Sequence, residues 1–247
     1  YHGFEDYFLM VADYTNWAKA QGIYVGPGRG SGCNCLVNYA LRITDVDPVL
    51  FDLDFSRFLR IDKKKMPDID LDFETSRRAE VIEYLLRRYP NNAAQICSYG
   101  LYRVDNLIND LTKVCGLEGN KEEIKQIKTF INRHINEGSL DFDAIAKSEE
   151  ARIWNAQYDN IIKHFCKLYN KIRYIGTHAA GVAITGKNIL EYTAIRIDSK
   201  TGKCFTSYDL NDMEKINVIK FDILGLTTMS SIGELRQLTG HDEFDEN

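Results

Sequence analysis

Three aspartates alternate with apolar residues in the segment 66–73, and their spacing allows them to act together. Asp68, Asp70 and Asp72 stand two residues apart, separated by Ile69 and Leu71. Residues two apart on a β-strand point to the same face, with Cα atoms about 6.6 Å apart. Carboxylate oxygens are the ligands that hard divalent cations such as Mg²⁺ take. The segment therefore predicts a strand that buries its apolar residues and presents converging carboxylates to metal ions.

A third carboxylate, Asp222, follows a second short apolar run, 218–221, which also contains Lys220. Two metal ions roughly 3.5 to 4 Å apart can activate an attacking hydroxyl and stabilise a leaving phosphate. Two carboxylates from one strand and a third from another strand are a workable minimum for such a site. Asp68, Asp70 and Asp222 are therefore the candidate metal ligands and catalytic residues.

The aspartate segment has two other interpretations. The first is a solvated strand face, which is the common outcome for an arbitrary alternation of this kind. The second is a calcium-binding EF-hand loop, because Asp68, Asp70 and Asp72 fit its first, third and fifth positions. That loop needs glycine at position six and glutamate at position twelve, where this sequence has Phe73 and Ala79. The EF-hand interpretation is excluded.

A glycine-rich loop, 26–32, supplies closely spaced backbone N–H groups together with Arg29 and Ser31, and a predicted helix follows it. Such a loop ahead of a helix is a plausible phosphate cradle, although many glycine-rich turns are purely structural. It lacks the Lys-Ser/Thr pair that closes a nucleotide-binding P-loop, and it lacks the G-x-G-x-x-G spacing of a dinucleotide fold. The loop strengthens the interpretation of the aspartates as a phosphoryl-transfer site.

Basic residues lie between the glycine loop and the aspartates. Arg57, flanked by Phe55 and Phe58, and the lysine triplet 63–65 can neutralise phosphates, although a lysine triplet is usually solvated surface. His178, in a run of small residues, either contacts substrate or serves as a packed or capping group.

The rest of the chain predicts an α+β protein with a helical insertion. Helical spacing of apolar residues predicts helices at 4–21, 35–41, 74–89, 104–115, 121–136, 149–171 and after 226. Runs rich in β-branched and aromatic residues predict strands at 181–185, 192–197, 203–208 and 218–221. A strand segment, a helical segment and a return to strands indicate a core interrupted by a helical domain.

Composition narrows the class of protein. The 247 residues are 44% hydrophobic, which is enough for one or two packed cores. With 31 basic and 36 acidic residues the net charge is −5, which argues against a uniformly basic nucleic-acid coat but leaves a local basic groove possible. Six scattered cysteines indicate reduced thiols in a cytoplasmic protein. No apolar run is long enough for a membrane span, so we expect no membrane partner.

Seven segments, in this order, resemble the motif blocks of the C family of DNA polymerases, the catalytic alpha subunits of bacterial DNA polymerase III. They are 7–14, 25–31, 41–48, 57–59, 66–73, 178–182 and 220–226. The resemblance runs almost end to end, and it departs from the family at 32–35, where the family usually has small residues and a serine. The chain begins without Met, and we expect it to be a piece of a longer polymerase.

The resemblance implies a fold and a division of the chain. The family's palm is similar to the polymerase-beta nucleotidyltransferase fold, a mixed sheet with flanking helices. Residues 1–98 and 178–247 would form the two parts of this palm, and residues 99–177 would form an inserted helical thumb that grips duplex DNA. The implied activity is that of a DNA-directed DNA polymerase in DNA replication, with primer-template DNA, deoxynucleoside triphosphates and the remaining domains of the parent polymerase as partners.

The resemblance also assigns residues. Asp68, Asp70 and Asp222 match the catalytic aspartates that bind two Mg²⁺ ions, for which Mn²⁺ can substitute, and Asp72 takes a supporting role. The nucleotide-phosphate contacts are Gly30, Ser31, Arg57 and Lys220.

Two alternatives stay open. One is a palm and thumb fragment that binds duplex DNA but is inactive without the fingers domain. The other is a different metal-dependent nucleotidyltransferase or a nuclease that uses the same three carboxylates.

Overall fold

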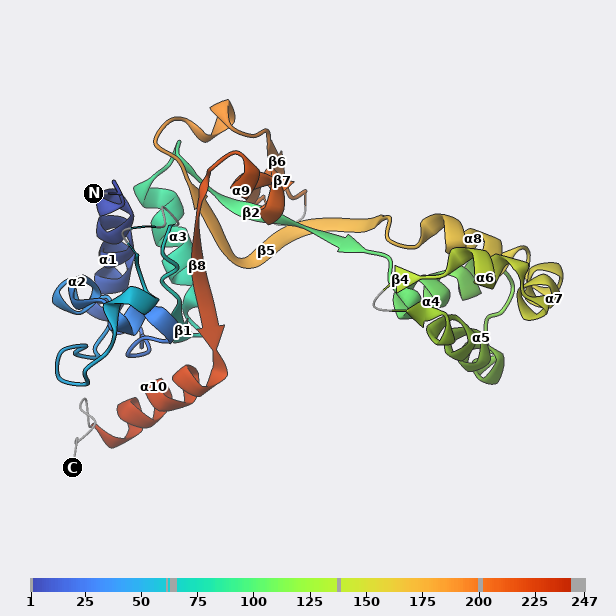
Figure 1. Cartoon of the computed structure of the whole chain (residues 1–247), viewed down its shortest axis with the longest axis horizontal. Coiled ribbons are helices and arrows are strands. Elements are labelled where there is room, and N and C mark those ends of the chain that lie inside the picture. Colours follow the sequence, from blue (N-terminus) through green and yellow to red (C-terminus); the bar gives the residue numbers. More distant parts are fainter. Residues whose placement is uncertain (1, 61, 63–65, 137–138, 200–201, 241–247) are drawn as a thin grey trace. The chain divides into compact units, whose positions relative to one another are not determined.

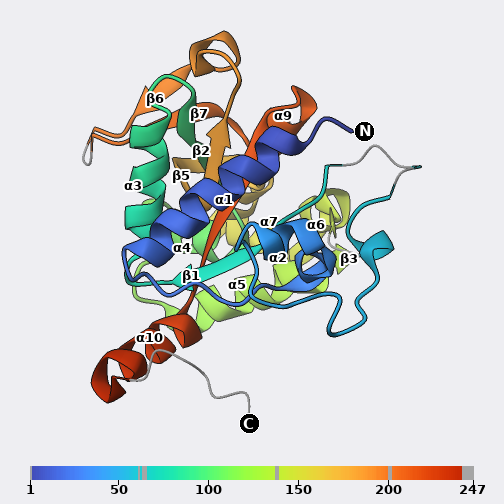
Figure 2. The same cartoon turned by 90° about the vertical axis from the view of Figure 1, so that its left-hand side faces the viewer.

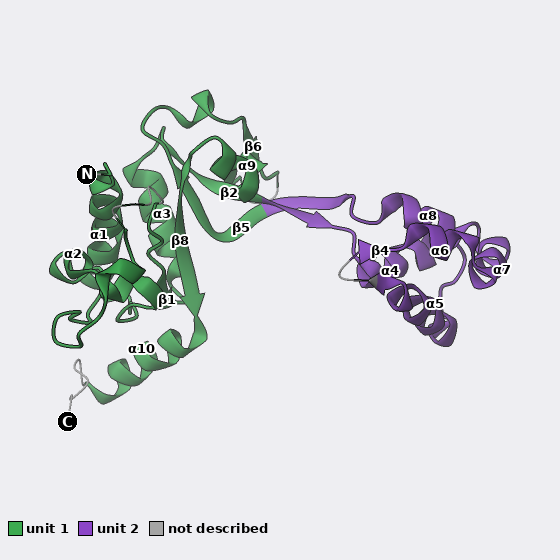
Figure 3. Ribbon diagram, in the orientation of Figure 1, with its two compact units in different colours: residues 1–97, 177–247 green, residues 98–176 purple. Residues whose placement is uncertain are grey.

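The computed structural model describes residues 2–60, 62, 66–136, 139–199 and 202–240, which divide into two compact units. Unit 1 comprises residues 1–97 and 177–247, and unit 2 comprises residues 98–176 (Figure 3). Helices and strands alternate in the mixed α+β manner that the sequence predicts (Figure 1). No described helix is both long and apolar enough to cross a membrane.

A six-stranded mixed sheet has the spatial order β1-β8-β5-β2-β7-β6. Its strands are β1 (Leu71–Glu74), β2 (Ala93–Leu101), β5 (Ile172–Ile184), β6 (Ile195–Ile197), β7 (Cys204–Asp209) and β8 (Ile219–Leu226). β8 runs parallel to β1 and antiparallel to β5. β7 runs parallel to β2 and antiparallel to β6. The chain passes from unit 1 to unit 2 within β2 and returns within β5.

Helices of unit 1 cover both faces of the sheet. The helices of unit 1 are α1 (Glu5–Ala20), α2 (Leu36–Ala40), α3 (Arg78–Arg88), α9 (Leu210–Lys215) and α10 (Thr227–Thr239), with 3₁₀ turns η1 (Gly30–Asn34), η2 (Phe55–Arg57) and η3 (Ile189–Glu191). α1 and α3 pack together over one face, on a core that includes Phe73, Val182 and Phe221 (Figure 2). A smaller core on the other face joins Met213 of α9 to Ala183 of β5. Successive side chains of a strand point to opposite faces of the sheet, so the same strands contribute apolar residues to both cores.

Unit 2 is mostly helical and has its own core. Its helices are α4 (Val104–Val114), α5 (Lys121–Arg133), α6 (Phe142–Lys147), α7 (Glu149–Gln157) and α8 (Ile161–Leu168), with a small hairpin of β3 (Ile135–Asn136) and β4 (Ser139–Leu140). The side chains of Asn120, Asp141 and Ser148 accept hydrogen bonds from the first turns of α5, α6 and α7. Each such cap is worth about 1 kcal/mol, because it satisfies a backbone N–H that the helix itself leaves unpaired.

The structure departs from the predicted secondary structure in several places, among them the aspartate segment, which is a strand only from Leu71. The helix expected over 149–171 is two helices, because Asp159 and Asn160 adopt positive φ angles that end α7 and start α8. The strand β2 was not predicted, since its polar and small residues hide the alternation. The strand expected from 192 begins only at Ile195 in β6, after the turn η3.

Candidate metal centre

The pairing of β1 with β8 brings the aspartates of two distant segments together. Leu71 pairs with Ile223 in parallel register, so extension of that register by one residue sets Asp70 opposite Asp222. Leu71 and Phe73 are fully buried, as is Ile223 on β8, so the aspartates occupy the opposite face of the sheet. The alternation in the sequence predicts this orientation, and the structure confirms it.

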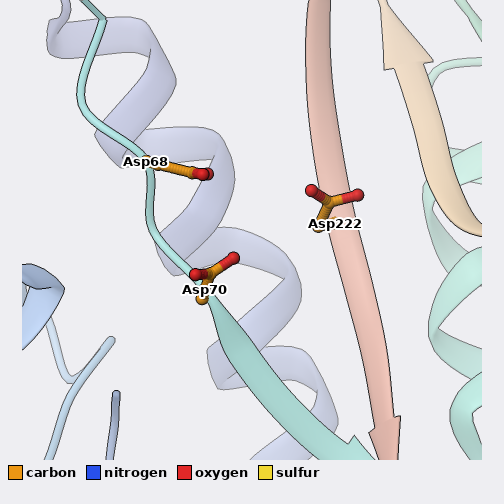
Figure 4. A group of neighbouring side chains, drawn as sticks. All are labelled: Asp68, Asp70 and Asp222. Atoms are coloured by element: carbon orange, nitrogen blue, oxygen red, sulfur yellow. The ribbon is translucent and has the colours of Figure 1, made fainter. Parts of the chain in front are cut away.

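Asp68, Asp70 and Asp222 each place one carboxylate oxygen within 4.8 Å of the others (Figure 4). Asp68 is exposed, whereas Asp70 and Asp222 are partly buried. Asp68 and Asp70 lie just ahead of β1 rather than within it. The hydrogen-bonded ladder starts later because Pro67 has no N–H and the N–H of Ile69 donates elsewhere.

Tyr7 of α1 supports the segment that carries two of these aspartates. Its hydroxyl oxygen accepts a hydrogen bond of 3.2 Å from the backbone N–H of Ile69. Burial raises the pKa of Tyr7, and the negative charges of Asp68, Asp222 and Asp70 raise it further. The phenol therefore stays neutral beneath the carboxylates. Sequence reasoning missed Tyr7, although a buried tyrosine hydroxyl usually has a hydrogen-bond partner.

Among the described residues, Arg29 and Lys220 form ion pairs with the aspartates. The guanidinium of Arg29 lies 3.6 Å from Asp70 and 3.7 Å from Asp72, and the ammonium of Lys220 lies 2.5 Å from Asp222. Lys220 and Asp222 stand two residues apart on β8, so both point to the same face. These ion pairs offset part of the repulsion among the aspartates.

The glycine loop is joined to the outer edge of β1. Val25 pairs with Phe73 in an antiparallel bridge, and the backbone N–H of Gly26 donates to the carbonyl of Asp72 at 2.8 Å. Gly28 has a φ of 120°, and a Cβ there would lie 2.8 Å from both Cys33 Sγ and Thr44 Cγ2. Only glycine fits this position. The loop is therefore held beside the aspartates by backbone contacts.

The remaining predicted nucleotide contacts lie on or near this loop. Gly30 is exposed and Ser31 is partly exposed, both in η1, which contacts η2. The side-chain amide of Asn34 donates to the carbonyl of Asp54 at 2.7 Å and ties the two turns together. Arg57 ends η2; its side chain is exposed and forms no ion pair with another described residue. The lysine triplet 63–65 lies outside the described residues.

The donor set fits hard divalent cations. Three carboxylates from two adjacent segments offer only oxygen ligands, which suit Mg²⁺ and Mn²⁺ better than metals that prefer sulfur or imidazole. Divalent cations held by such carboxylates would align a nucleophile with a phosphoryl group. The arrangement is chemically suited to phosphoryl transfer.

Comparisons with known proteins agree with this geometry. Residues 1–225 match the family model described as "Bacterial DNA polymerase III alpha NTPase domain". The chain is 38% identical to DNA polymerase III subunit alpha of Deinococcus radiodurans over 244 residues, which cover 96% of this chain and 18% of that protein. It is 36% identical to the Pseudomonas aeruginosa protein of that name, and 35% identical to the one from Thermus aquaticus, over 93% and 96% of this chain. The chain spans about a fifth of the length of these relatives.

Proposed function

Since the chain belongs to the bacterial DNA polymerase III alpha family, we propose that it forms the catalytic core of a DNA-directed DNA polymerase. Its reaction is the template-directed addition of deoxynucleotides to a primer 3′ end during DNA replication. The observation that carries the proposal is the convergence of Asp68, Asp70 and Asp222 within 4.8 Å of one another. Three converging carboxylates repel one another, and bound cations would offset that repulsion.

In this proposal the two parts of the palm are residues 1–98 and 178–247, with a fold like that of polymerase-beta nucleotidyltransferases. Residues 99–177 form an inserted thumb that grips the primer-template duplex. The compact helical unit 98–176 and its separate core support this division. The mixed sheet with helices on both faces supports the palm assignment.

Asp68, Asp70 and Asp222 would hold two Mg²⁺ ions, or Mn²⁺ in their place. When bound, these ions lower the pKa of the primer hydroxyl and neutralise the charge of the triphosphate. The protein's own contribution is to hold the carboxylates at fixed positions. The Tyr7 contact to Ile69 fixes the segment of Asp68 and Asp70, and the ladder of β8 fixes Asp222.

The triphosphate would lie against the glycine loop. Gly30 and Ser31 offer a backbone N–H and a hydroxyl, and Arg57 and Lys220 offer positive charge. The primer 3′-hydroxyl attacks the α-phosphate of the nucleotide, the bond to the β-phosphate breaks, and pyrophosphate leaves. Because attacking and leaving oxygens lie roughly in line, the primer end must approach from the side away from the loop.

Primer extension tests the proposal. The chain is incubated with a labelled primer-template, all four deoxynucleotides and Mg²⁺, beside Asp68→Asn, Asp222→Asn and the control Asp143→Asn. Asp143 is an exposed aspartate of α6 in unit 2. We expect extension by the parent and the control and none by the other two. Equal extension by Asp68→Asn and Asp222→Asn would overturn the proposal, and a shortened primer would indicate a nuclease.

A second candidate function is duplex DNA binding without extension. The relatives are about five times longer than the chain, so residues outside it can supply groups that complete the site. For this candidate, the parent chain would bind primer-template DNA in a salt-sensitive manner and would release no pyrophosphate. Addition of the remaining part of the polymerase would then restore extension.

A further inference from the structure

Hydrogen bonds fix the orientation of the His178 ring and determine which nitrogen carries the proton of the neutral ring. Its Nδ1 atom accepts hydrogen bonds from the backbone N–H groups of Gly181, at 2.8 Å, and Ala180, at 3.3 Å. A ring nitrogen that accepts two hydrogen bonds carries no proton, so the proton of the neutral ring is on Nε2. Within the described part of the chain, Nε2 has no hydrogen-bond partner. His178 is partly exposed, so this N–H group is available to a ligand.

The imidazole of His178 lies on the sheet face that carries Asp222. Gly181 of β5 pairs directly with Asp222 of β8 in antiparallel register. Paired residues of an antiparallel ladder point to the same face, with Cβ atoms about 5 Å apart. A Cβ added to Gly181 would lie 3.0 Å from Nδ1 of His178. The imidazole therefore fills the space that a side chain at 181 would occupy, and it lies within about 8 Å of the Asp222 Cβ.

The order of strands places His178 opposite the glycine loop. The loop is joined to the outer edge of β1, whereas β5 lies on the other side of β8 (Figure 1). The three carboxylates stand between them, on β8 and just ahead of β1. In the proposed reaction the triphosphate lies on the loop side, and in-line attack requires the primer end on the far side. That is the side on which His178 lies.

We propose that His178 contacts the primer, by donating a hydrogen bond from Nε2 to the phosphate that links the last two primer nucleotides. This inference rests on the proposed polymerase function. The phosphate carries a full negative charge and only accepts hydrogen bonds, which matches a fixed N–H donor. Hydrogen bonds to phosphate from protein side chains position a nucleic acid without reading its sequence, as a primer contact in a replicative enzyme requires.

The alternative is a purely structural role, in which His178 only caps the two backbone N–H groups. His178→Asn separates the two roles. An asparagine Oδ1 can accept the same backbone hydrogen bonds at a position close to Nδ1, but the side chain is too short to replace the donor at Nε2. If His178 has only the structural role, His178→Asn should leave primer binding unchanged. If His178 contacts the primer, the same substitution should weaken primer binding.

The test measures binding of two primer-templates to the whole chain by fluorescence anisotropy in Mg²⁺ without nucleotides. One primer is natural, and the other has an uncharged methylphosphonate at its last linkage. We expect the parent to bind the natural primer about tenfold more tightly, because hydrogen bonds to charged groups are the stronger class. We expect His178→Asn to unfold at the same urea concentration as the parent. It should bind the natural primer about tenfold more weakly than the parent does, and it should bind the natural and the methylphosphonate primers equally. A methylphosphonate several linkages upstream is the control.

Three outcomes would overturn the inference. The first is a parent chain that binds both primers equally, a result that does not depend on the folding of any variant. The second is a His178→Asn variant that discriminates as well as the parent. The third is a parent that does not bind the primer-template, which would count against the proposed function as well. The proposed function fails independently if Asp68→Asn and Asp222→Asn extend primers like the parent.

Discussion

The hydroxyl oxygen of Tyr7 accepts the hydrogen bond of the Ile69 backbone N–H, 62 residues further along the chain. Ile69 stands between Asp68 and Asp70, and its side chain is buried in the core of unit 1. This one contact links α1 to the segment that carries two of the three converging carboxylates. It also replaces a ladder hydrogen bond that β8 does not supply at this position.

Tyr7→Phe removes this contact and leaves the Ile69 N–H without a partner in a buried segment. We expect a loss of about 1 to 3 kcal/mol in the free energy of unfolding, the cost of a buried unpaired donor. We also expect weaker Mg²⁺ binding, because Asp68 and Asp70 lose a constraint. Urea unfolding and metal titration measure the two effects. Tyr14→Phe, which removes the hydroxyl of a second buried tyrosine in the same helix, is the matched control.

The stability of the chain should fall in alkaline solution. Burial raises the pKa of Tyr7 above its ordinary value of about 10. The unfolded chain therefore releases this proton first as pH rises. The stabilisation from the neutral phenol is complete below about pH 10 and is lost above it, by about 1.4 kcal/mol per pH unit.

Urea unfolding across this pH range checks the prediction. The free energy of unfolding of the parent should fall more steeply above about pH 10 than that of Tyr7→Phe. Buried thiols and other tyrosines titrate in both proteins, so the difference between the slopes isolates Tyr7. Equal slopes would show that Tyr7 ionises as readily in the folded chain as in the unfolded chain.

Two glycines of the same loop should respond differently to alanine. Gly28 has a φ of 120°, and an alanine Cβ there would lie 2.8 Å from Cys33 and Thr44. We therefore expect Gly28→Ala to lower the free energy of unfolding by about 3 kcal/mol or more. Gly30 has a φ of 61°, and no atom lies within 4 Å of the Cβ that alanine would add. We therefore expect Gly30→Ala to lower the free energy of unfolding by only about 1 kcal/mol. Urea unfolding compares the pair. Similar losses would mean that the loop relaxes around the added methyl group at Gly28.

Mg²⁺ should stabilise unit 1 through the aspartates. With a dissociation constant of about 1 mM, about 10 mM Mg²⁺ adds about 1.4 kcal/mol to the free energy of unfolding. For a protein of this size that corresponds to a rise in Tm of roughly 3 to 6 °C. The rise should vanish in Asp70→Asn and persist in Asp143→Asn. A parent whose Tm does not change with Mg²⁺ would contradict an assembled site.

Arg29 should compete with metal for Asp70. Its guanidinium lies 3.6 Å from the Asp70 carboxylate. Its positive charge would repel a divalent cation bound to that carboxylate. We expect Arg29→Gln to bind Mg²⁺ about threefold to tenfold more tightly and Arg29→Lys to resemble the parent, because lysine keeps the charge. Arg29 is half exposed, so the free energy of unfolding should change by less than about 1 kcal/mol. Weaker Mg²⁺ binding by Arg29→Gln would instead show that Arg29 orients the carboxylates.

Local chemistry along the chain was enough to predict most elements of the fold. The helical spacing of apolar residues predicted α1 and α4 to within two residues, and alternation predicted that Ile69, Leu71 and Phe73 are buried beneath the aspartates. Period and burial are local properties that depend on side-chain type alone. The strand β2 was not predicted, because its small and polar residues do not show a clear alternation, and strand formation depends strongly on neighbouring strands.

The sequence by itself determined which residue types can bind metal and phosphate, and that Asp68 and Asp70 share a face. Only the tertiary structure decided that Asp222 stands opposite Asp70, because strand order and register depend on contacts between segments about 150 residues apart in the chain. It likewise decided the support from Tyr7, the ion pair of Arg29 and the orientation of His178. No local pattern encodes these contacts, since each depends on packing between distant segments.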